Sequence, residues 1–228
     1  MTPLYLHGLP GSAAELALGL PNLPVLDRAA PSFAQLANAL PAGPLHLIGF
    51  SLGAACALRL AALAPNKIGK LTLISPAAPL ELGEFLPKMA GAPVFRAARS
   101  HAQLSVLTAV QSTLVRFSPA RMTRMLAKGV SEDEAQLITS KPVQTAVQEG
   151  LTTHKATYLR EISAYVQPWA QHLGHVTCPV ALNHGKADTW APIEMSEALA
   201  ARLQNATLHA LPDLGHYGAL QATLRNIQ

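Results

Sequence analysis

The sequence predicts an α/β fold in which helices cover both faces of a mostly parallel β-sheet. Half of the 228 residues are hydrophobic and only 13% are charged, which suits strands that are buried on both faces. Short apolar runs alternate along the chain with helix-like segments, as in successive βα units. Residues 80–172 interrupt this alternation with helical periodicity and no convincing strand. We therefore expect an α/β core with an all-helical insertion.

Six apolar runs are predicted as strands, and three intervening segments as helices. The strands are residues 3–7, 23–27, 44–50, 70–75, 179–184 and 206–211, and the helices are residues 31–40, 52–65 and 193–204. The first helix begins with Pro and Ser, which favour a first turn. The third has an apolar stripe at Met195, Leu199 and Leu203. These elements divide the chain into a core of residues 1–79 and 173–228 and a helical insertion of residues 80–172.

Bulk properties exclude several classes of protein. The most apolar stretch, residues 47–58, contains three helix-interrupting or polar positions and is too short to span a bilayer. The N-terminus has no secretion signature, and two cysteines make no disulfide framework, so we expect a cytoplasmic protein. The net charge of +4 comes from scattered basic residues without a run or an aromatic stripe. We expect no nucleic-acid or membrane partner and only a weak bias toward anionic ligands.

The stretch GFSLG, residues 49–53, joins the third predicted strand to the helix at 52–65. A strand, the pattern G-x-S-x-G and a helix together form the arrangement called the nucleophile elbow. The small residues on either side of Ser51 let strand and helix pass closely, while the helix directs its positive N-terminus at the site. Alone, the five-residue pattern is weak, but its position between strand and helix favours a nucleophile.

A serine nucleophile of this kind uses an acid and then a histidine, each on a loop after a later strand. Asp188 follows the fifth predicted strand, and His216 follows the last. The chain order Ser51, Asp188, His216 therefore matches the requirement. Asp188 has a second interpretation as a helix cap before Pro192.

Four motifs resemble those of the α/β-hydrolase superfamily, in the expected order and over nearly the whole chain. They are HGLPGS (7–12), GFSLG (49–53), HGKADTWAP (184–192) and DLGHYG (213–218). The helical insertion falls where this family places its lid. Family members usually begin with an antiparallel hairpin, whereas this chain starts at the HG-bearing strand. The resemblance thus implies a reduced sheet of about six mostly parallel strands, with residues 23–27 at an edge.

The resemblance also assigns roles to residues. It implies that Ser51 attacks a carbonyl carbon, that His216 takes its proton and that Asp188 orients the imidazole. The backbone N–H groups of Leu9 and Leu52 would form the oxyanion hole, and no cofactor or metal is expected. Phe50, Trp190 and Tyr217 are expected to border the substrate pocket. Aromatic and methionine side chains of the insertion either line an acyl pocket or form its own packing: Phe85, Met89, Phe95, Phe117, Met122 and Met125.

Other polar residues have simpler interpretations. Glu81 and Glu84 follow the fourth predicted strand, where some relatives carry the acid, but are expected to be solvated, and Asp213 is expected to be a loop residue. Cys56 is expected to be a small core residue. His7 and His184 are expected to shape their loops through hydrogen bonds. Four further histidines show no convincing metal-ligand spacing and are expected on the surface or in the insertion: His101, His154, His172 and His175.

Three function hypotheses remain at this stage. The first is a serine hydrolase that cleaves a small carboxylic ester or thioester. The second is a C–C hydrolase, lyase or acyltransferase of the same fold acting on an anionic metabolite, held by basic residues of the insertion: Arg96, Arg99, Arg116, Arg121 and Arg124. Their helical spacing is equally typical of a solvated face. The third is a non-catalytic binder. The sequence does not predict the oligomeric state.

Overall fold

A computed structural model describes residues 1–20 and 22–227 of the chain. Its centre is a sheet of five parallel strands whose order in space equals their order in the sequence. The strands are β1 (Thr2–Leu6), β2 (Leu45–Phe50), β3 (Ile68–Ile74), β4 (Val180–Gly185) and β5 (Ala206–Leu211). Leucines and isoleucines in β2 and β3 are fully buried, as expected where helices cover both faces of a parallel sheet. The predicted fold class is confirmed.

The predicted strand at residues 23–27 is not a strand of this sheet. It runs beside β1 but forms only one parallel bridge, between Val25 and Tyr5. The backbone carbonyl of Tyr5 accepts a hydrogen bond from the N–H of Leu26, and the backbone N–H of Tyr5 donates one to the carbonyl of Pro24. Pro24 has no N–H to donate, which limits further pairing. The described sheet therefore has five strands and not six, and the segment lies at the edge beside β1, as expected.

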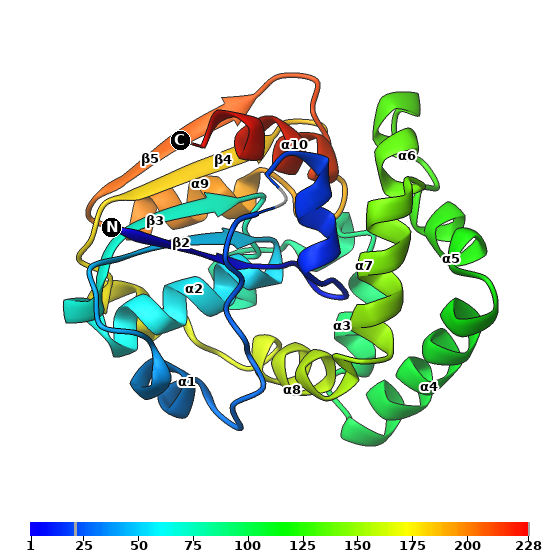
Figure 1. Cartoon of the computed structure of the whole chain (residues 1–228), viewed down its shortest axis with the longest axis horizontal. Helices are drawn as coiled ribbons and strands as arrows, with labels where there is room; N and C mark the ends of the chain where they lie inside the picture. The colour runs from blue at the N-terminus through cyan, green and yellow to red at the C-terminus, as the bar shows by residue number, and fades with distance from the viewer. Residues whose placement is uncertain (21, 228) are drawn as a thin grey trace.

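Helices cover both faces of the sheet (Figure 1). On one face lie α1 (Phe33–Ala39), α2 (Leu52–Leu63) and α9 (Glu194–Arg202), and on the other lies α10 (His216–Asn226) with the short helix η1 (Ala13–Leu18). α2 is buried along most of its length because nearly all of its residues are Ala, Leu or Gly. None of the helices in the described residues is long and apolar enough to cross a membrane.

Residues 80–172 contain six α-helices and no strand. They are α3 (Ala92–Ala97), α4 (His101–Phe117), α5 (Pro119–Leu126), α6 (Glu132–Ile138), α7 (Lys141–Leu151) and α8 (Lys155–Tyr165). We call this part the helical segment. Serines begin several of these helices, and the hydroxyls of Ser100 and Ser131 accept backbone N–H bonds as N-caps. The segment lies beyond the carboxyl ends of the strands, with α4 and α5 farthest from the sheet (Figure 1).

Candidate active site

Ser51 stands on a strained turn between β2 and α2. Its backbone has φ 55° and ψ −121°, a conformation that costs a non-glycine residue about 1–3 kcal/mol. A Cβ atom at Gly53 would lie 2.1 Å from the carbonyl oxygen of Leu6, and one at Gly49 would lie 2.6 Å from the Cα of Ala54. The glycines on either side of Ser51 are therefore required by the close passage of strand and helix, as in a nucleophile elbow.

Asp188 and His216 meet in a buried pair. His216 Nδ1 donates to Asp188 Oδ2 at 2.6 Å, and Asp188 Oδ1 accepts the N–H groups of Trp190 and Ala191 at 2.8 and 3.0 Å. Burial alone raises the pKa of Asp188, but the charge and hydrogen bond of His216 outweigh it, so the pKa lies below its ordinary value. Because an ionised carboxylate only accepts, Nδ1 carries the proton and Nε2 is left free to act as a base.

His184 lies beside this pair, with its Nε2 3.5 Å from Asp188 Oδ2. Its Nε2 donates to the carbonyl of Ala191 at 2.8 Å, and its Nδ1 accepts from the hydroxyl of Ser196 at 2.6 Å. Burial lowers the pKa of His184, which keeps the ring neutral. The ring thus fixes the loop that carries Asp188. This agrees with the structural role predicted for it.

Aromatic rings hold His216 in place. The Trp190 ring stacks on the imidazole with centroids 5.4 Å apart, and the Phe50 ring lies 4.6 Å from it. Phe50 and Tyr217 are buried behind His216 and do not line the cavity described below, so the prediction that they border the pocket is wrong. Both face the packing between β2 and α10. Within the described residues no hydrogen bond joins the Ser51 hydroxyl to His216, a contact that often forms only once substrate is bound.

Ser51 opens into a cavity of about 440 Å³, a size typical of small-molecule sites. Leu9, Leu52 and Trp190 border it beside Ser51. The N–H of Leu52 is in the first turn of α2 and has no partner within the helix. A Cβ atom at Gly8 would lie 3.5 Å from the Cβ of Ser51, so the loop that carries Leu9 passes close to the serine. Both predicted oxyanion residues are thus beside Ser51.

The rest of the cavity lining comes mainly from the helical segment. Its side chains are almost all apolar, and include Met89, Val94, Phe95, Leu107, Met122, Met125, Leu126, Tyr158 and Ile162. Four of the six side chains considered for an acyl pocket are in this lining. Phe85 is instead buried in the core, and Phe117 is 86% exposed. The five arginines considered for an anionic substrate are absent from the lining, whose only cation is Lys128.

Comparison with known proteins agrees with this geometry. Residues 25–223 match the family model described as the alpha/beta hydrolase fold. The chain belongs to the alpha/beta hydrolase fold family. The resemblance predicted from the four motifs is therefore confirmed, and the chain is an enzyme of the α/β-hydrolase type.

Individual relatives of this α/β-hydrolase are more distant. The chain is 27% identical over 214 residues to the pimeloyl-[acyl-carrier protein] methyl ester esterase of Chromobacterium violaceum, covering 93% of this chain and 76% of that protein. It is 29% identical over 187 residues to an Arabidopsis thaliana protein named "Probable lysophospholipase BODYGUARD 2", covering 75% of this chain but only 38% of that protein. The thermophilic esterase of Thermogutta terrifontis has the same fold, with a TM-score of 0.64 at 16% identity and coverage of 98% and 85%. At the level of the family, the relatives support an ester hydrolase.

A buried carboxylate that sequence reasoning missed supports the HG loop of this hydrolase. Glu15 Oε1 accepts the Tyr5 hydroxyl at 2.6 Å and the N–H of Gly8 at 2.9 Å. Burial raises the pKa of Glu15 to about 7, and these two hydrogen bonds offset only part of that effect. The sequence signal was present, because Ser12 and Glu15 have the spacing of a capping box. The structure directs the carboxylate to Gly8 instead.

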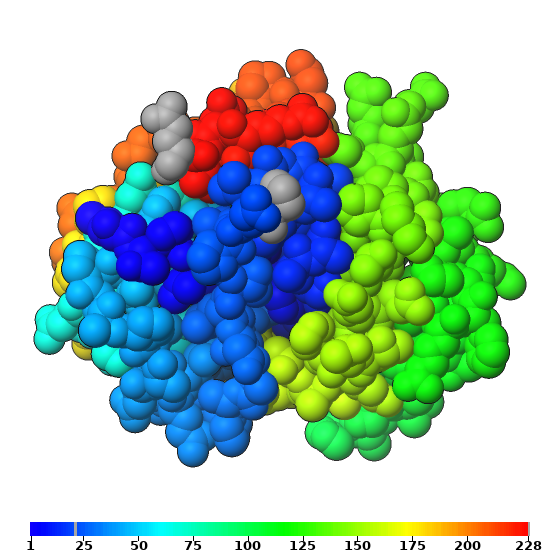
Figure 2. Space-filling model, in the orientation of Figure 1, coloured from blue at the N-terminus to red at the C-terminus, as the bar shows by residue number. Residues whose placement is uncertain are grey.

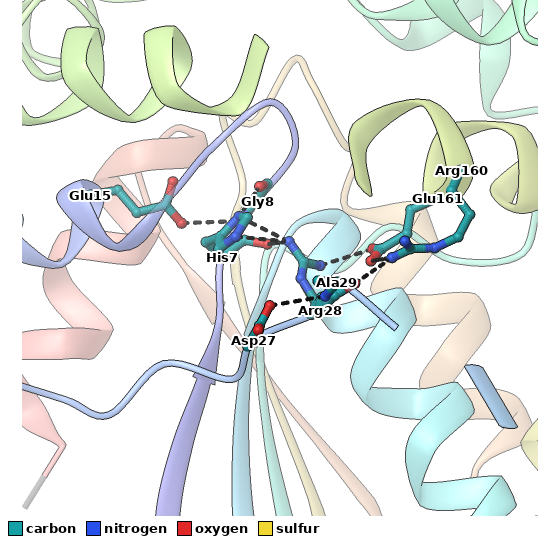
Figure 3. A network of polar contacts seen from close by, with 8 residues as sticks. All are labelled: His7, Gly8, Glu15, Asp27, Arg28, Ala29, Arg160 and Glu161. Carbon is teal, nitrogen blue, oxygen red and sulfur yellow. Dashed lines mark hydrogen bonds and ion pairs between the residues drawn. The ribbon is translucent and has the colours of Figure 1, made fainter. Parts of the chain in front are cut away.

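Two contacts join the HG loop to the helical segment. The Ser12 hydroxyl donates to Glu149 at 2.5 Å. Arg28, which is almost fully buried, donates to Glu161 at 2.9 Å and to the carbonyl of His7 at 3.0 Å (Figure 3). Figure 3 shows Arg28 between His7 on one side and Glu161 on the other. A cation from the core is therefore paired with a carboxylate from α8 directly beside the loop that carries Leu9.

Glu134 joins the helical segment to the helix that carries His216. Its carboxylate accepts the backbone N–H groups of Tyr217 and Gly218 at 2.7 and 2.9 Å. These groups belong to the first turn of α10, where a helix leaves its N–H groups unpaired. Sequence analysis placed His216 on a loop, whereas it is the first residue of α10. The carboxylate that caps this helix comes from 83 residues before Tyr217 in the chain, so no local pattern revealed it.

The alternative acids and ligands lie elsewhere. Glu81 accepts the N–H groups of Trp169 and Ala170 at the start of a short helix, and Asp213 is in a turn with φ 57°. In the residues that the structure describes, no group of three or more His, Cys, Asp or Glu side chains is placed to hold a metal ion. A second cavity of about 450 Å³, lined by His46, Lys70 and Asn226, lies away from Ser51. Ligands of open parallel sheets bind instead at the carboxyl ends of the strands, where Ser51 lies.

Proposed function

We propose that the chain hydrolyses a small carboxylic ester or thioester through an acyl-enzyme formed on Ser51. The buried 2.6 Å hydrogen bond between His216 and Asp188 is the observation that carries the proposal. It supports the tautomer in which Nε2 accepts a proton. The contact between the rings of His216 and Phe50, the residue before Ser51, supports a position of this base near the serine. Ser51 Oγ attacks the carbonyl carbon while Nε2 takes the hydroxyl proton. Asp188 then stabilises the imidazolium.

The remaining steps use groups beside Ser51. The N–H groups of Leu9 and Leu52 hold the oxyanion of the tetrahedral intermediate, an effect worth about 10²–10³ in kcat for each donor. His216 returns the proton to the leaving alcohol or thiol, and the acyl group stays on Ser51. A water molecule, activated by His216 in turn, releases the acid.

The lining of the cavity favours an apolar acyl group. The curated relative from Chromobacterium violaceum is named as a methyl ester esterase, which supports ester cleavage by this chain as well. The second hypothesis, an anionic metabolite held by arginines, has no supporting contact, because none of the five arginines lines the cavity. We also propose that the core is formed by residues 1–79 and 173–228 and that residues 80–172 act as its cap, since residues of the helical segment supply most of the cavity wall.

The test is steady-state hydrolysis of a series of p-nitrophenyl and acyl-thioester substrates with increasing chain length. We expect turnover by the wild type and its loss in Ser51→Ala and His216→Ala, with the native circular dichroism spectrum retained by both variants. His209→Ala is the matched control, since that histidine is exposed on β5. Substantial turnover by Ser51→Ala would overturn the proposal. Preference for longer acyl chains over acetyl esters is expected from the apolar lining.

A further inference from the structure

One stretch of the helical segment, between Glu84 and Glu132, carries a large excess of positive charge. Between Glu84 and Glu132 the sequence has seven Lys or Arg residues and no Asp or Glu. The rest of the chain has ten basic and 13 acidic residues. Sequence analysis described the basic residues as scattered, because they form no run. The informative feature of the sequence is that this long stretch contains no acidic residue, which makes one part of the molecule strongly cationic.

The same part exposes large apolar side chains. Of the six large hydrophobic side chains that are exposed in the described residues, four are on α4 and α5. Val106 is 67% exposed, Val110 62%, Phe117 86% and Met125 51%. The three residues of α4 are spaced by four and seven positions, so they form one stripe along the helix. An exposed apolar stripe of this kind marks an interaction surface.

Basic residues are close to these hydrophobic residues in the sequence. Arg116 is adjacent to Phe117 on α4, and Arg121 and Arg124 are exposed on α5 with Met125. We call these residues, with Val106 and Val110, the α4–α5 face. In Figures 1 and 2 α4 and α5 form the outer edge of the molecule, at the right in green, away from the sheet. Nothing in the described residues covers this edge.

The α4–α5 face continues into the cavity that contains Ser51. Met125 belongs to both, since it is half exposed and also lines the cavity. Leu107 and Gln111 from α4 and Lys128 after α5 line the same cavity. If an apolar phase contacted this face, a ligand that moved from it into the protein would therefore reach the cavity directly, without crossing the rest of the surface.

We propose that the α4–α5 face docks on an anionic lipid surface, with Val106, Val110 and Phe117 inserted among the acyl chains and the arginines bound to the headgroups. Helices that lie in a membrane interface combine an apolar face with Lys and Arg in this way, and anionic headgroups attract such clusters. Val110 and Phe117 line an open apolar hollow on α4 together with Leu114, and the arginines of the same two helices carry the charge that an anionic lipid surface complements. Peripheral docking needs no membrane-spanning helix. The expectation of no membrane partner rested on the absence of a membrane-spanning segment and did not address peripheral docking. Docking itself does not depend on the proposed esterase activity.

The test is sedimentation of the full chain with vesicles of phosphatidylcholine alone or mixed with phosphatidylserine. We expect binding only with phosphatidylserine and weaker binding at higher salt. Arg121→Gln with Arg124→Gln should weaken it by roughly 10- to 30-fold, and Val110→Ser with Phe117→Ser should abolish it. Leu63→Ser, and Lys186→Gln with Arg202→Gln, are the controls, because these residues are exposed elsewhere. None of the four residues substituted on the α4–α5 face lines the cavity. Hydrolysis of a soluble short ester by these variants should therefore be unchanged.

Two results would overturn the proposal. One is an absence of phosphatidylserine-dependent binding by the wild type, or binding that both α4–α5 variants retain in full. The other comes from a parallel measurement on immobilised polyglutamate. If Phe117 is required for binding polyglutamate while the vesicles do not bind at all, the face recognises an acidic protein and not a membrane. The ester assay is separate, so a failure of docking and a failure of the proposed hydrolysis are distinguishable.

Discussion

Replacing Glu134 by alanine should impair both stability and turnover, although Glu134 is not in the cavity. The substitution removes the acceptor of two buried N–H groups, those of Tyr217 and Gly218. A buried donor left without a partner costs about 1–3 kcal/mol. The free energy of unfolding should therefore fall by about 2–6 kcal/mol. Because these groups begin the helix that holds His216, we also expect the imidazole to shift.

The assay is urea unfolding together with steady-state kinetics. A misplacement of a reacting group by about 1 Å costs on the order of 10²-fold in rate, so kcat for a p-nitrophenyl ester should fall by about 10- to 100-fold, with little change in KM. Glu134→Gln keeps one acceptor oxygen and should lie between wild type and Glu134→Ala. Glu132→Ala is the control, since Glu132 is exposed in the same helical turn. The reasoning is refuted if Glu134→Ala and Glu132→Ala have equal midpoints and equal kcat.

Three further changes test other parts of the site. Gly53→Ala places a Cβ atom 2.1 Å from the carbonyl oxygen of Leu6, so thermal denaturation should show that the free energy of unfolding falls by about 3 kcal/mol or more. Gly174→Ala is the control and should be neutral, because a Cβ atom there has nothing within 4 Å. Equal melting temperatures of the two variants would contradict this. Folding raises the pKa of Glu15 from 4.5 to about 7. The protonated carboxyl therefore contributes its full stabilisation of the folded state below pH 4.5, and this contribution is lost as the pH rises through 7. Wild type should accordingly lose up to about 3 kcal/mol relative to Glu15→Gln between about pH 5 and pH 8, and parallel pH–stability curves for the two would disprove the buried-carboxylate account. Asp188→Asn should lower kcat by about 10⁴-fold at an unchanged fold by circular dichroism, and near-normal turnover would exclude Asp188 as the orienting acid.

The sequence predicted the parts of the site that depend on local pattern or on chain order. The elbow at Ser51 was recognisable in the sequence because the turn requires small residues at positions 49 and 53, and both lie within one five-residue pattern. Asp188 and His216 followed from their positions after two strands, and the structure brings them into contact. The second interpretation of Asp188, as a helix cap, is wrong, because α9 begins at Glu194 with Ile193 as its N-cap. Asp188 Oδ1 instead accepts the N–H of Trp190 within the loop, while Oδ2 contacts His216.

The parts that the sequence did not predict depend on contacts between distant segments. Glu134 and Glu161 stand in no motif of the sequence, and only the packing of the helical segment directs them to α10 and Arg28. The predicted strand at 23–27 has the right hydrophobicity but lies at an edge, where few hydrogen bonds are available. Phe50 was expected in the pocket, yet its ring packs against His216 and is not part of the cavity lining.

The most direct test of the account is covalent labelling of the folded protein with a fluorophosphonate, followed by peptide mass spectrometry. The account predicts one phosphonylated residue, Ser51, and no labelling of Ser51→Ala. It also predicts that His216→Ala, which keeps the serine but lacks the base, is labelled far more slowly than wild type. Labelling of another residue, or equal rates for wild type and His216→Ala, would contradict the claim that Ser51 is activated by the His216–Asp188 pair.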